Sequence, residues 1–147
     1  MIKIYYPTHP FKIREPQRKK EEIWDELRKI WVRLTPEEWV RQNFIQYLLQ
    51  IKNYPASYMA VERRMKLGEL NKRFDLLVFD KAAQPWMLVE CKAMEEKLDS
   101  RVLWQVLRYN MAIPIKYLVI TNGEECHAFI KGLTDFEDIA ALPAYSE

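Results

Sequence analysis

The chain has 147 residues, a length that suits one domain with a substantial buried core. Hydrophobic residues make up 49% and charged residues 30%, which excludes a disordered or fibrous protein, and a net charge of +2 is too small to indicate a nucleic-acid partner by itself. Because two cysteines make no disulfide framework, the N-terminus has no signal-peptide pattern and no apolar run reaches ~20 residues, we expect a cytoplasmic protein that does not bind membranes.

The first 20 residues are expected to form a loosely attached N-terminal arm. Pro7, Pro10 and Pro16 favour extended or irregular chain there. We therefore place the globular domain at residues 21–147.

Residues 21–34 have two interpretations. Their apolar side chains follow helical spacing, which favours a helix, but Trp, Ile and Val are also good strand residues, so a strand–turn–strand unit is the alternative. The next signal is clearer. Thr35 can cap a helix, Pro36 suits its first position and Glu38 completes a capping box, so we expect a helix that runs to about Lys52.

The rest of the chain alternates strand and helix signals. Three strands joined by short links predict an antiparallel meander, and the later elements add a helix, two strands and a short helix. The expected strands are residues 57–66, 73–80, 86–92, 115–121 and 126–130, and the expected helices are residues 99–111 and 135–142. This order predicts an α/β (α+β) fold with a mixed sheet of about five strands flanked by helices.

Charged residues gather where two of these strands end. Glu90 and Lys92 are two positions apart at the end of an apolar strand, so they share a face. Asp75 lies on the preceding strand, and pairing through the turn near residues 84–85 brings it close to the level of Glu90. Two carboxylates and the backbone carbonyl of Cys91 form a partial oxygen shell of the kind that Mg²⁺ prefers.

This grouping predicts metal-assisted hydrolysis of a phosphodiester. A divalent ion polarises a phosphoryl oxygen and supplies a nucleophile near neutral pH, while Lys92 orients that nucleophile or stabilises developing charge. Solvated strand-end charges are the plainer interpretation. Glu62, a lone acid on an apolar strand, either forms a salt bridge with Arg64 or Arg73 or contacts the metal.

The spacing Asp75…Glu90-x-Lys92 resembles the PD-(D/E)xK nuclease superfamily. More specifically, the chain resembles the N-terminal nuclease-like domain of type I restriction enzyme R subunits. The similar segments are LTPEEWVRQ (34–42), MAVERRM (59–65), KRFDLLVFD (72–80), MLVECKA (87–93), WQVLRYN (104–110) and YLVITNGEECHAF (117–129). They span most of the chain.

The resemblance implies a restriction-endonuclease-like three-layer core that cuts DNA with Mg²⁺, for which Mn²⁺ can substitute. It implies that Asp75 and Glu90 are metal ligands and that Lys92 is the catalytic lysine. Gln105 matches a glutamine that such nucleases place beside the site, and Tyr109 follows one turn later on the same face. Glu38 matches a further ligand in some relatives, although the capping box already explains it, and Arg41 is placed to orient Glu38 or a phosphate.

The expected function is therefore that of a metal-dependent endodeoxyribonuclease. Type I R subunits also carry a long motor region, which 147 residues cannot include. A non-catalytic DNA- or protein-binding module on a nuclease fold is the alternative. The expected partners are DNA, other subunits of a restriction-modification system and a second copy of the chain. Four tryptophans at core-like positions are expected to pack in the core rather than on bases: Trp24, Trp31, Trp39 and Trp104.

Overall fold

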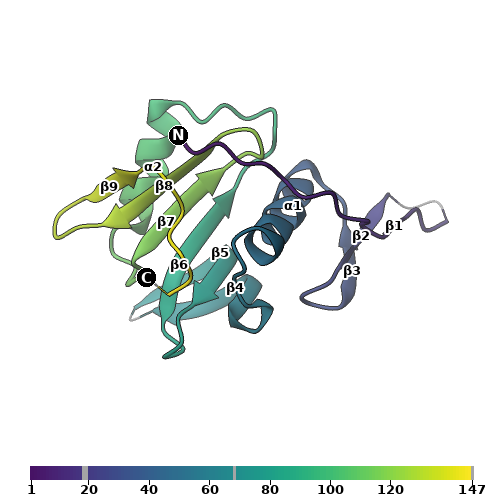
Figure 1. Ribbon diagram of the computed structural model, residues 1–147, viewed down its shortest axis with the longest axis horizontal. Coiled ribbons are helices and arrows are strands. Elements are labelled where there is room, and N and C mark those ends of the chain that lie inside the picture. The colour runs from purple at the N-terminus through teal and green to yellow at the C-terminus, as the bar shows by residue number, and fades with distance from the viewer. Residues whose placement is uncertain (18–19, 68, 147) are drawn as a thin grey trace.

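The computed structural model describes residues 1–17, 20–67 and 69–146, which form two sheets and two α-helices (Figure 1). The main sheet has the strand order β4-β5-β6-β7-β8-β9, and the smaller sheet has the order β1-β2-β3. The strands are β1 (Ile13–Arg14), β2 (Glu22–Asp25), β3 (Ile30–Arg33), β4 (Met59–Leu67), β5 (Leu70–Phe79), β6 (Pro85–Cys91), β7 (Tyr117–Thr121), β8 (Cys126–Lys131) and β9 (Phe136–Ile139). The helices are α1 (Pro36–Gln50), α2 (Ser100–Asn110) and a short 3-10 turn (Ala56–Tyr58).

The main sheet is mixed, as predicted. Strands β4, β5 and β6 form the expected antiparallel meander, and β6 then pairs in parallel with β7. A parallel pair cannot be joined by a tight turn, and α2 makes the crossover. The short helix expected over residues 135–142 is wrong. Residues 136–139 form a sixth strand instead, since pairing with β8 satisfies backbone groups that would otherwise remain at that edge.

The two helices cover opposite faces of the main sheet, which gives the predicted three layers. On one face Val40, Phe44 and Leu48 of α1 pack in the same buried cluster as Leu76 and Val89. On the other face α2 contributes its apolar side to a second cluster, built on inward-facing residues of β5, β6 and β7. The residues of α2 in that cluster are Val102, Leu103, Val106 and Leu107.

Helix α1 begins where the capping signal predicts. The Thr35 side chain accepts a hydrogen bond from the Glu38 backbone N–H at 3.0 Å, and Pro36 occupies the first helical turn. The helix ends at Gln50, close to the expected Lys52. This helix places Glu38 and Arg41, one turn apart, against the main sheet.

Residues 21–34 form a strand–turn–strand unit, so the helix favoured above is wrong and the alternative is right. Ile23 and Asp25 alternate inward on β2 and are fully buried. The Asp25 carboxylate accepts hydrogen bonds from the backbone N–H groups of Leu27 and Arg28, each at 2.9 Å, and Lys29 then adopts a φ of 55°. This side-chain cap fixes a turn in place of the helical hydrogen bonds.

The N-terminal segment is extended, but it is not loosely attached. Ile2 is 8% exposed and belongs to the α1-side cluster, and its backbone N–H donates to the Cys126 carbonyl at 2.7 Å. Ile4 and Tyr6 pack on the same cluster. Burial of apolar side chains therefore holds the segment across the domain, while the division at residue 20 stays a prediction.

The tryptophans are less buried than expected. Trp24 and Trp31 are half-buried and contact one another across the small sheet, and Trp39 of α1 is also half-buried. Trp104 is 57% exposed, so the prediction of a core position is wrong for this residue. The helical spacing of Trp104 does not show whether this part of α2 is covered by the rest of the protein.

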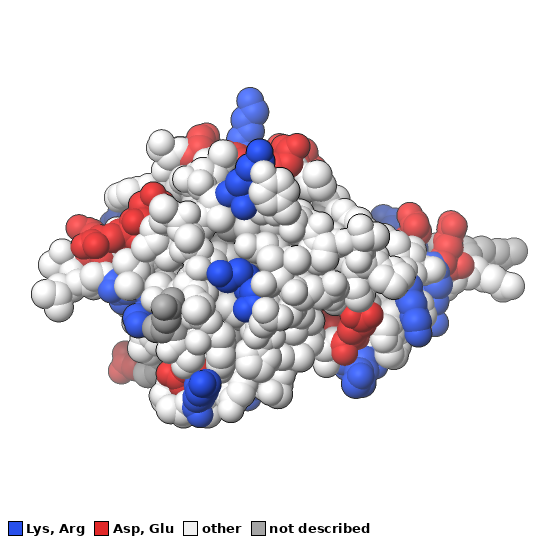
Figure 2. Space-filling model, in the orientation of Figure 1, with Lys and Arg blue, Asp and Glu red and all other residues white. Residues whose placement is uncertain are grey.

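Two surface properties complete the fold. No helix in the described part of the chain is both long and apolar enough to span a membrane. On the face shown in Figure 2, acidic and basic side chains are scattered among uncharged ones. This face therefore has no large area of a single charge.

Candidate active site

The candidate site lies where β5 and β6 separate. Their pairing ends at Leu76 and Val89, and the same register places Asp75 opposite Glu90 at the next step. The Cys91 backbone N–H donates to Asp75 Oδ2 at 2.9 Å, so the aspartate replaces a strand-to-strand hydrogen bond. Glu90 and Asp75 also share a side-chain hydrogen bond. The structure thus brings together the two carboxyl groups that the spacing predicts.

Strand alternation sets the direction of the Glu90–Lys92 pair. Val89 and Cys91 are buried in the α1-side cluster, so Glu90 between them faces the α2 side. The charge of Lys92 acts on Glu90, and the Lys92 backbone N–H donates to the Thr121 carbonyl at 2.8 Å. The Lys92 backbone is thus fixed next to Glu90, and its charge reaches the carboxyl pair, while a catalytic role for the side chain stays a prediction.

Burial and charge make Glu90 a weak acid. Burial is the largest cause, and the charge of Asp75 adds to it, while Lys92 and then Lys72 act in the opposite direction. The balance raises the pKa of Glu90 to about 7. Without a bound cation, the pair therefore tends to hold a proton between its two carboxyl groups.

Lys72 is a buried cation near Glu90 that the sequence motifs do not single out. It is 9% exposed, and its Nζ donates to the Tyr109 carbonyl at 3.1 Å and to Asn110 Oδ1 at 3.2 Å. Burial lowers the pKa of Lys72, and the charge of Glu90 partly offsets that effect. Lys72 lies two positions before Phe74 on β5, so strand geometry places its charge on the same inward face as that buried ring. This spacing could have identified Lys72 from the sequence.

The regular alternation of β4 and β5 breaks beside Asp75. Phe74 belongs to the α2-side cluster and Leu76 to the α1-side cluster, although residues two apart normally share a face. On β4, Glu62 has a φ of 48°, and it stands between Val61, which pairs with Leu76, and the residue that pairs with Phe74. Such backbone costs on the order of 1–3 kcal/mol. At this irregularity both Glu62 and Asp75 come within reach of Arg41 of α1.

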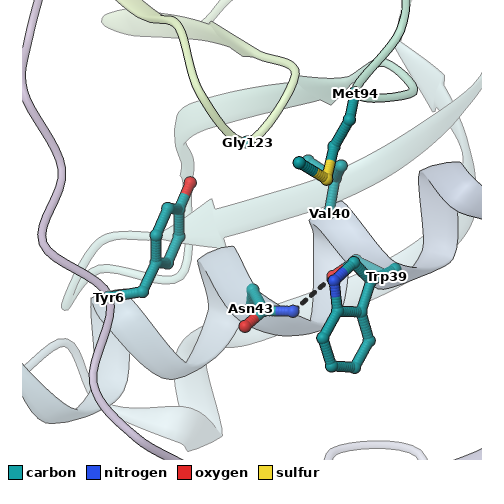
Figure 3. A pocket seen from close by; sticks show the side chains of 6 residues that line it. All are labelled: Tyr6, Trp39, Val40, Asn43, Met94 and Gly123. Carbon is teal, nitrogen blue, oxygen red and sulfur yellow. Dashed lines mark hydrogen bonds between the residues drawn. The ribbon is translucent and has the colours of Figure 1, made fainter.

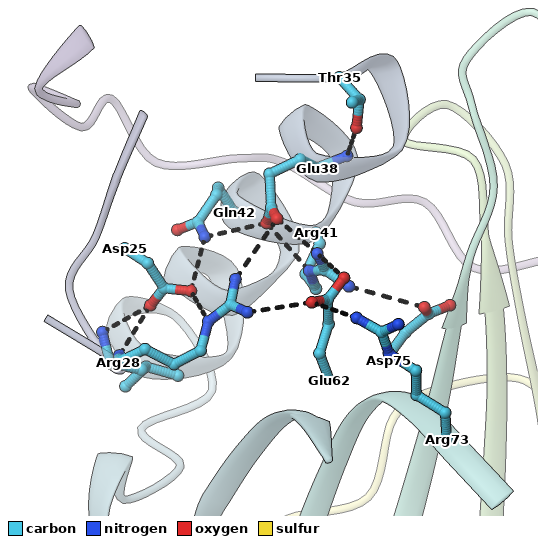
Figure 4. Close-up of polar contacts among 10 residues, drawn as sticks. Asp25, Arg28, Thr35, Glu38, Arg41, Gln42, Glu62, Arg73 and Asp75 are labelled. Atoms are coloured by element: carbon cyan, nitrogen blue, oxygen red, sulfur yellow. Dashed lines mark hydrogen bonds and ion pairs between the residues drawn. The ribbon is translucent and has the colours of Figure 1, made fainter. Parts of the chain in front are cut away.

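An arginine network, which we define as Asp25, Arg28, Glu38, Arg41, Gln42, Glu62 and Arg73, fills the space between α1, β4 and the turn after β2 (Figure 4). Arg41 is its centre. It donates to Glu38 through Nε at 2.9 Å and through Nη2, donates to Glu62 at 2.9 Å, and lies 3.6 Å from Asp75 Oδ1. Arg28 donates hydrogen bonds to both Glu62, from Nη1 at 3.1 Å, and Asp25, from Nε at 2.6 Å. The network therefore links the small sheet to Asp75.

Three residues of the network have the structural contacts expected from the sequence: Glu38, Arg41 and Glu62. Arg41 orients Glu38, and Arg73 forms the expected salt bridge with Glu62 at 2.8 Å. Burial acts to raise the pKa of Glu62, but Arg41 and then Arg73 outweigh it and hold the pKa at about 2. Glu38 and Glu62 thus have arginine partners, and a metal-ligand role for either stays a prediction.

Gln105 lies on the exposed surface of α2. It lines a hollow together with Asn71, Lys72 and Tyr109, and the pairing of Tyr109 with Gln105 on one helix face is as expected. The Lys72 ammonium lies 3.1 Å from the centre of the Tyr109 ring. A role for Gln105 beside the carboxyl pair stays a prediction.

The chemistry of the donor set fits a hard divalent cation. Within residues 1–17, 20–67 and 69–146 no three His, Cys, Asp or Glu side chains are grouped to hold a metal. Asp75 and Glu90 instead offer two carboxylates, and the adjacent Cys91 offers its backbone carbonyl. The Cys91 thiol is not a suitable ligand, because burial raises its pKa and keeps it protonated. Mg²⁺ in proteins usually binds to few protein ligands and retains several of its water molecules.

The raised pKa of Glu90 predicts a gain in stability when its charge is removed. Glu90 is harder to ionise in the folded protein than its ordinary pKa of 4.5 implies, so its stabilising contribution is complete below pH 4.5 and is lost as pH rises through 7. In EDTA at pH 8, Glu90→Gln is therefore expected to unfold at higher urea concentration than wild type, by roughly 1–3 kcal/mol.

At pH 5 the two proteins are expected to differ little, because Glu90 is protonated in the folded state. Glu95→Gln changes an exposed glutamate close along the chain and serves as the control. If Glu90→Gln is instead less stable than wild type at pH 8, the negative charge of Glu90 does not destabilise the folded protein.

Comparison with known proteins identifies the family. The family model described as type I restriction enzyme R protein N terminus (HSDR_N) matches residues 36–143. A search of curated proteins finds no match. The matched region runs from α1 through β9 and contains Asp75, Glu90 and Lys92. Because the family model covers most of the chain, this protein belongs to the family of type I restriction enzyme R protein N-terminal regions.

Proposed function

We propose that this domain hydrolyses phosphodiester bonds of DNA as a Mg²⁺-dependent endonuclease, on a core of the PD-(D/E)xK type. The observation that carries the proposal is the half-buried pair of Asp75 and Glu90 with the charge of a lysine acting on it. Membership of a restriction-enzyme family supports DNA as the substrate and other restriction-modification subunits as partners.

Each residue of the site has a distinct task in this proposal. Asp75 is fixed by the Cys91 N–H on one oxygen and faces Arg41 on the other, so its orientation is set before any ligand arrives. Glu90 supplies the second carboxylate. Together they would hold Mg²⁺, with Mn²⁺ as a substitute, and the ion would supply Lewis-acid activation of the scissile phosphate.

Lys92 completes the arrangement as a positive charge. It follows Glu90 on the same face, where it stands beside the carboxyl pair rather than within the arginine network. A compact ammonium there attracts a phosphate oxygen and stabilises the negative charge that develops during hydrolysis. Lys72 adds a second positive charge that acts on Glu90, and its Nζ is held in place by hydrogen bonds to the end of α2.

Cleavage of supercoiled plasmid DNA tests the proposal. Wild type is expected to nick or linearise the plasmid with Mg²⁺ or Mn²⁺ and to leave it intact in EDTA. Asp75→Asn is expected to reduce the rate by about 100-fold or more, because it removes a charge that the ion requires. Asp138→Asn, on exposed β9, is the matched control and is expected to cut at the wild-type rate.

Two results would decide against cleavage by this chain. Equal loss of plasmid with wild type and Asp75→Asn would indicate a contaminating nuclease. DNA binding without cleavage under either metal would instead favour the alternative, a non-catalytic binding module on a nuclease fold.

A further inference from the structure

A cavity of about 160 Å³ opens where the N-terminal segment, α1 and the loops after β6 and β7 meet (Figure 3). We call it the ring pocket, and its lining residues are Tyr6, Trp39, Val40, Asn43, Met94 and Gly123. A cavity of about 150 Å³ is enough to hold one benzene molecule. The ring pocket therefore has room for one flat aromatic ring.

The walls of the ring pocket suit such a ring. Trp39 offers a flat indole, and Met94, 47% exposed, offers an adaptable thioether at the surface. Gly123 has a φ of +97°, and a Cβ there would lie 3.4 Å from Met94 Cγ and from Val40 Cγ2. A glycine at this turn therefore keeps the space between the loop and the helix open.

Two polar side chains also border the ring pocket. The Tyr6 hydroxyl is buried, and its neighbour among the described residues is the Thr121 hydroxyl, with which it makes no hydrogen bond of good geometry. The nearby Thr121 hydroxyl is already committed, since it donates to the Glu125 carbonyl at 2.8 Å and accepts from the Gly123 N–H at 3.1 Å. Burial raises the pKa of Tyr6 to about 12, so the hydroxyl stays protonated and able to donate.

Asn43 supplies the complementary group. Its Nδ2 donates to the Trp39 backbone carbonyl at 2.9 Å, which leaves Oδ1 on the other side of the amide to accept a hydrogen bond (Figure 3). Purines and pyrimidines carry donors and acceptors around their ring edge. An unpaired buried polar group costs free energy, so a ring with a polar edge fits this pocket better than a hydrocarbon.

The ring pocket adjoins the candidate active site along the chain. Met94 follows Lys92 by two residues, and Val40 precedes Arg41, which lies 3.6 Å from Asp75. The Lys92 N–H donates to the carbonyl of Thr121, just before the Gly123 turn. The pocket and the site are thus formed by the ends of the same three elements, α1, β6 and β7.

We propose that the ring pocket binds one nucleobase that has left its stack in a DNA strand, with Trp39 as the stacking surface and with Tyr6 and Asn43 at its polar edge. The proposal rests on the proposed function in taking DNA as the substrate. Stacking on an aromatic side chain serves any base, because every base has a π face. The pocket thereby places an unstacked base beside the loop that follows Lys92 and carries Met94.

A fluorescent base tests the proposal in EDTA, where no metal supports cleavage. The probe is a short DNA duplex with a single unpaired 2-aminopurine, and its partner has an abasic residue at the same position. Wild type is expected to change the 2-aminopurine emission and to bind the abasic duplex about tenfold more weakly. Trp39→Leu is expected to bind both duplexes equally, whereas Trp39→Phe keeps most of the preference.

Two further variants separate the pocket from general effects. Trp104→Leu removes an exposed tryptophan of α2 outside the pocket and is expected to keep the tenfold preference. Asn43→Leu leaves Trp39 in place, and it is expected to lower the preference severalfold even if Trp39→Leu does not fold. Thermal melting checks the fold of each variant.

The outcomes distinguish this proposal from the proposed function. Equal binding of the two duplexes by wild type would overturn the ring pocket and leave the nuclease proposal standing. A preference that survives in Trp39→Leu and Asn43→Leu would also overturn it. Displacement of the duplex by adenosine 5′-monophosphate at the same concentration as the duplex would assign the pocket to a free nucleotide instead. Failure to bind either duplex would overturn the ring pocket, and plasmid cleavage with Mg²⁺ would then decide the nuclease proposal separately.

Discussion

Lys92→Met is expected to lower the rate of plasmid cleavage by about 100- to 1000-fold, the cost of removing one group that stabilises charge in a transition state. Methionine keeps the length and apolar stem of the side chain and removes only its charge. Because Lys92 is a cation beside Asp75 and Glu90, its loss is not expected to weaken Mg²⁺ binding. Lost cleavage with retained metal affinity, measured by calorimetry, is therefore the expected combination.

Two companion variants sharpen this result. Lys97→Met removes an exposed lysine from the same loop and is expected to cut at the wild-type rate. Lys92→Arg is expected to recover little activity, since a planar guanidinium does not reproduce a compact ammonium in a partly buried place. Cleavage by Lys92→Met within threefold of wild type would remove the lysine from the mechanism.

Arg41→Met is expected to destabilise the domain by about 3–5 kcal/mol, because it removes the partner of buried charges. The Arg41 and Glu38 side chains are 7% and 5% exposed, and Arg41 also holds Glu62 and faces Asp75. Its loss leaves the Glu38 carboxylate, among the described residues, with Arg28 at 3.4 Å and Gln42 at 3.1 Å as its polar side-chain partners. Urea unfolding at pH 7 measures the effect.

Two comparisons assign that loss to burial rather than to charge in general. Arg73 is 59% exposed and contacts Glu62 alone among its described ion-pair partners, so Arg73→Met is expected to cost less than about 1 kcal/mol. Adding Glu38→Gln to Arg41→Met is expected to restore part of the stability, since it removes the unpaired charge. Similar losses from Arg41→Met and Arg73→Met would contradict the account of the network.

The sequence predicts local structure best where a backbone group finds a partner nearby. Thr35 caps the N–H of Glu38 three residues away, so the start of α1 is visible in a short motif. The Asp75–Glu90 pair can also be predicted from the sequence, because the short link between β5 and β6 allows few pairing registers between the two strands. These features gave the three layers, the meander and the carboxyl pair.

Other features depend on contacts between distant segments. Residues 21–34 satisfy both helical and strand patterns, and the turn is decided by Asp25, whose carboxylate meets Arg28 and the Gln42 amide of α1. Lys72 matters because α2 returns beside it, almost forty residues later along the chain. Such partners follow from the folded sheet, and no periodicity in the sequence encodes them.

The acidic segment after β8 illustrates the same limit. Residues 135–142 include several acids and are expected to form a short helix, yet Phe136 and Ile139 pack on opposite faces of the sheet. Pairing with the edge of β8 then favours a strand over a helix. Tertiary pairing outweighs weak local preference in this segment.

The central claim is that Asp75 and Glu90 together bind the metal that cleavage requires. The most direct measurement is anomalous diffraction from crystals of the domain soaked in Mn²⁺, beside crystals of Asp75→Asn soaked in the same way. We expect the strongest anomalous peak to lie between the carboxylates of Asp75 and Glu90 and to be lost in Asp75→Asn. A strongest peak at Glu38 and Glu62, or one that persists unchanged in Asp75→Asn, would contradict this claim.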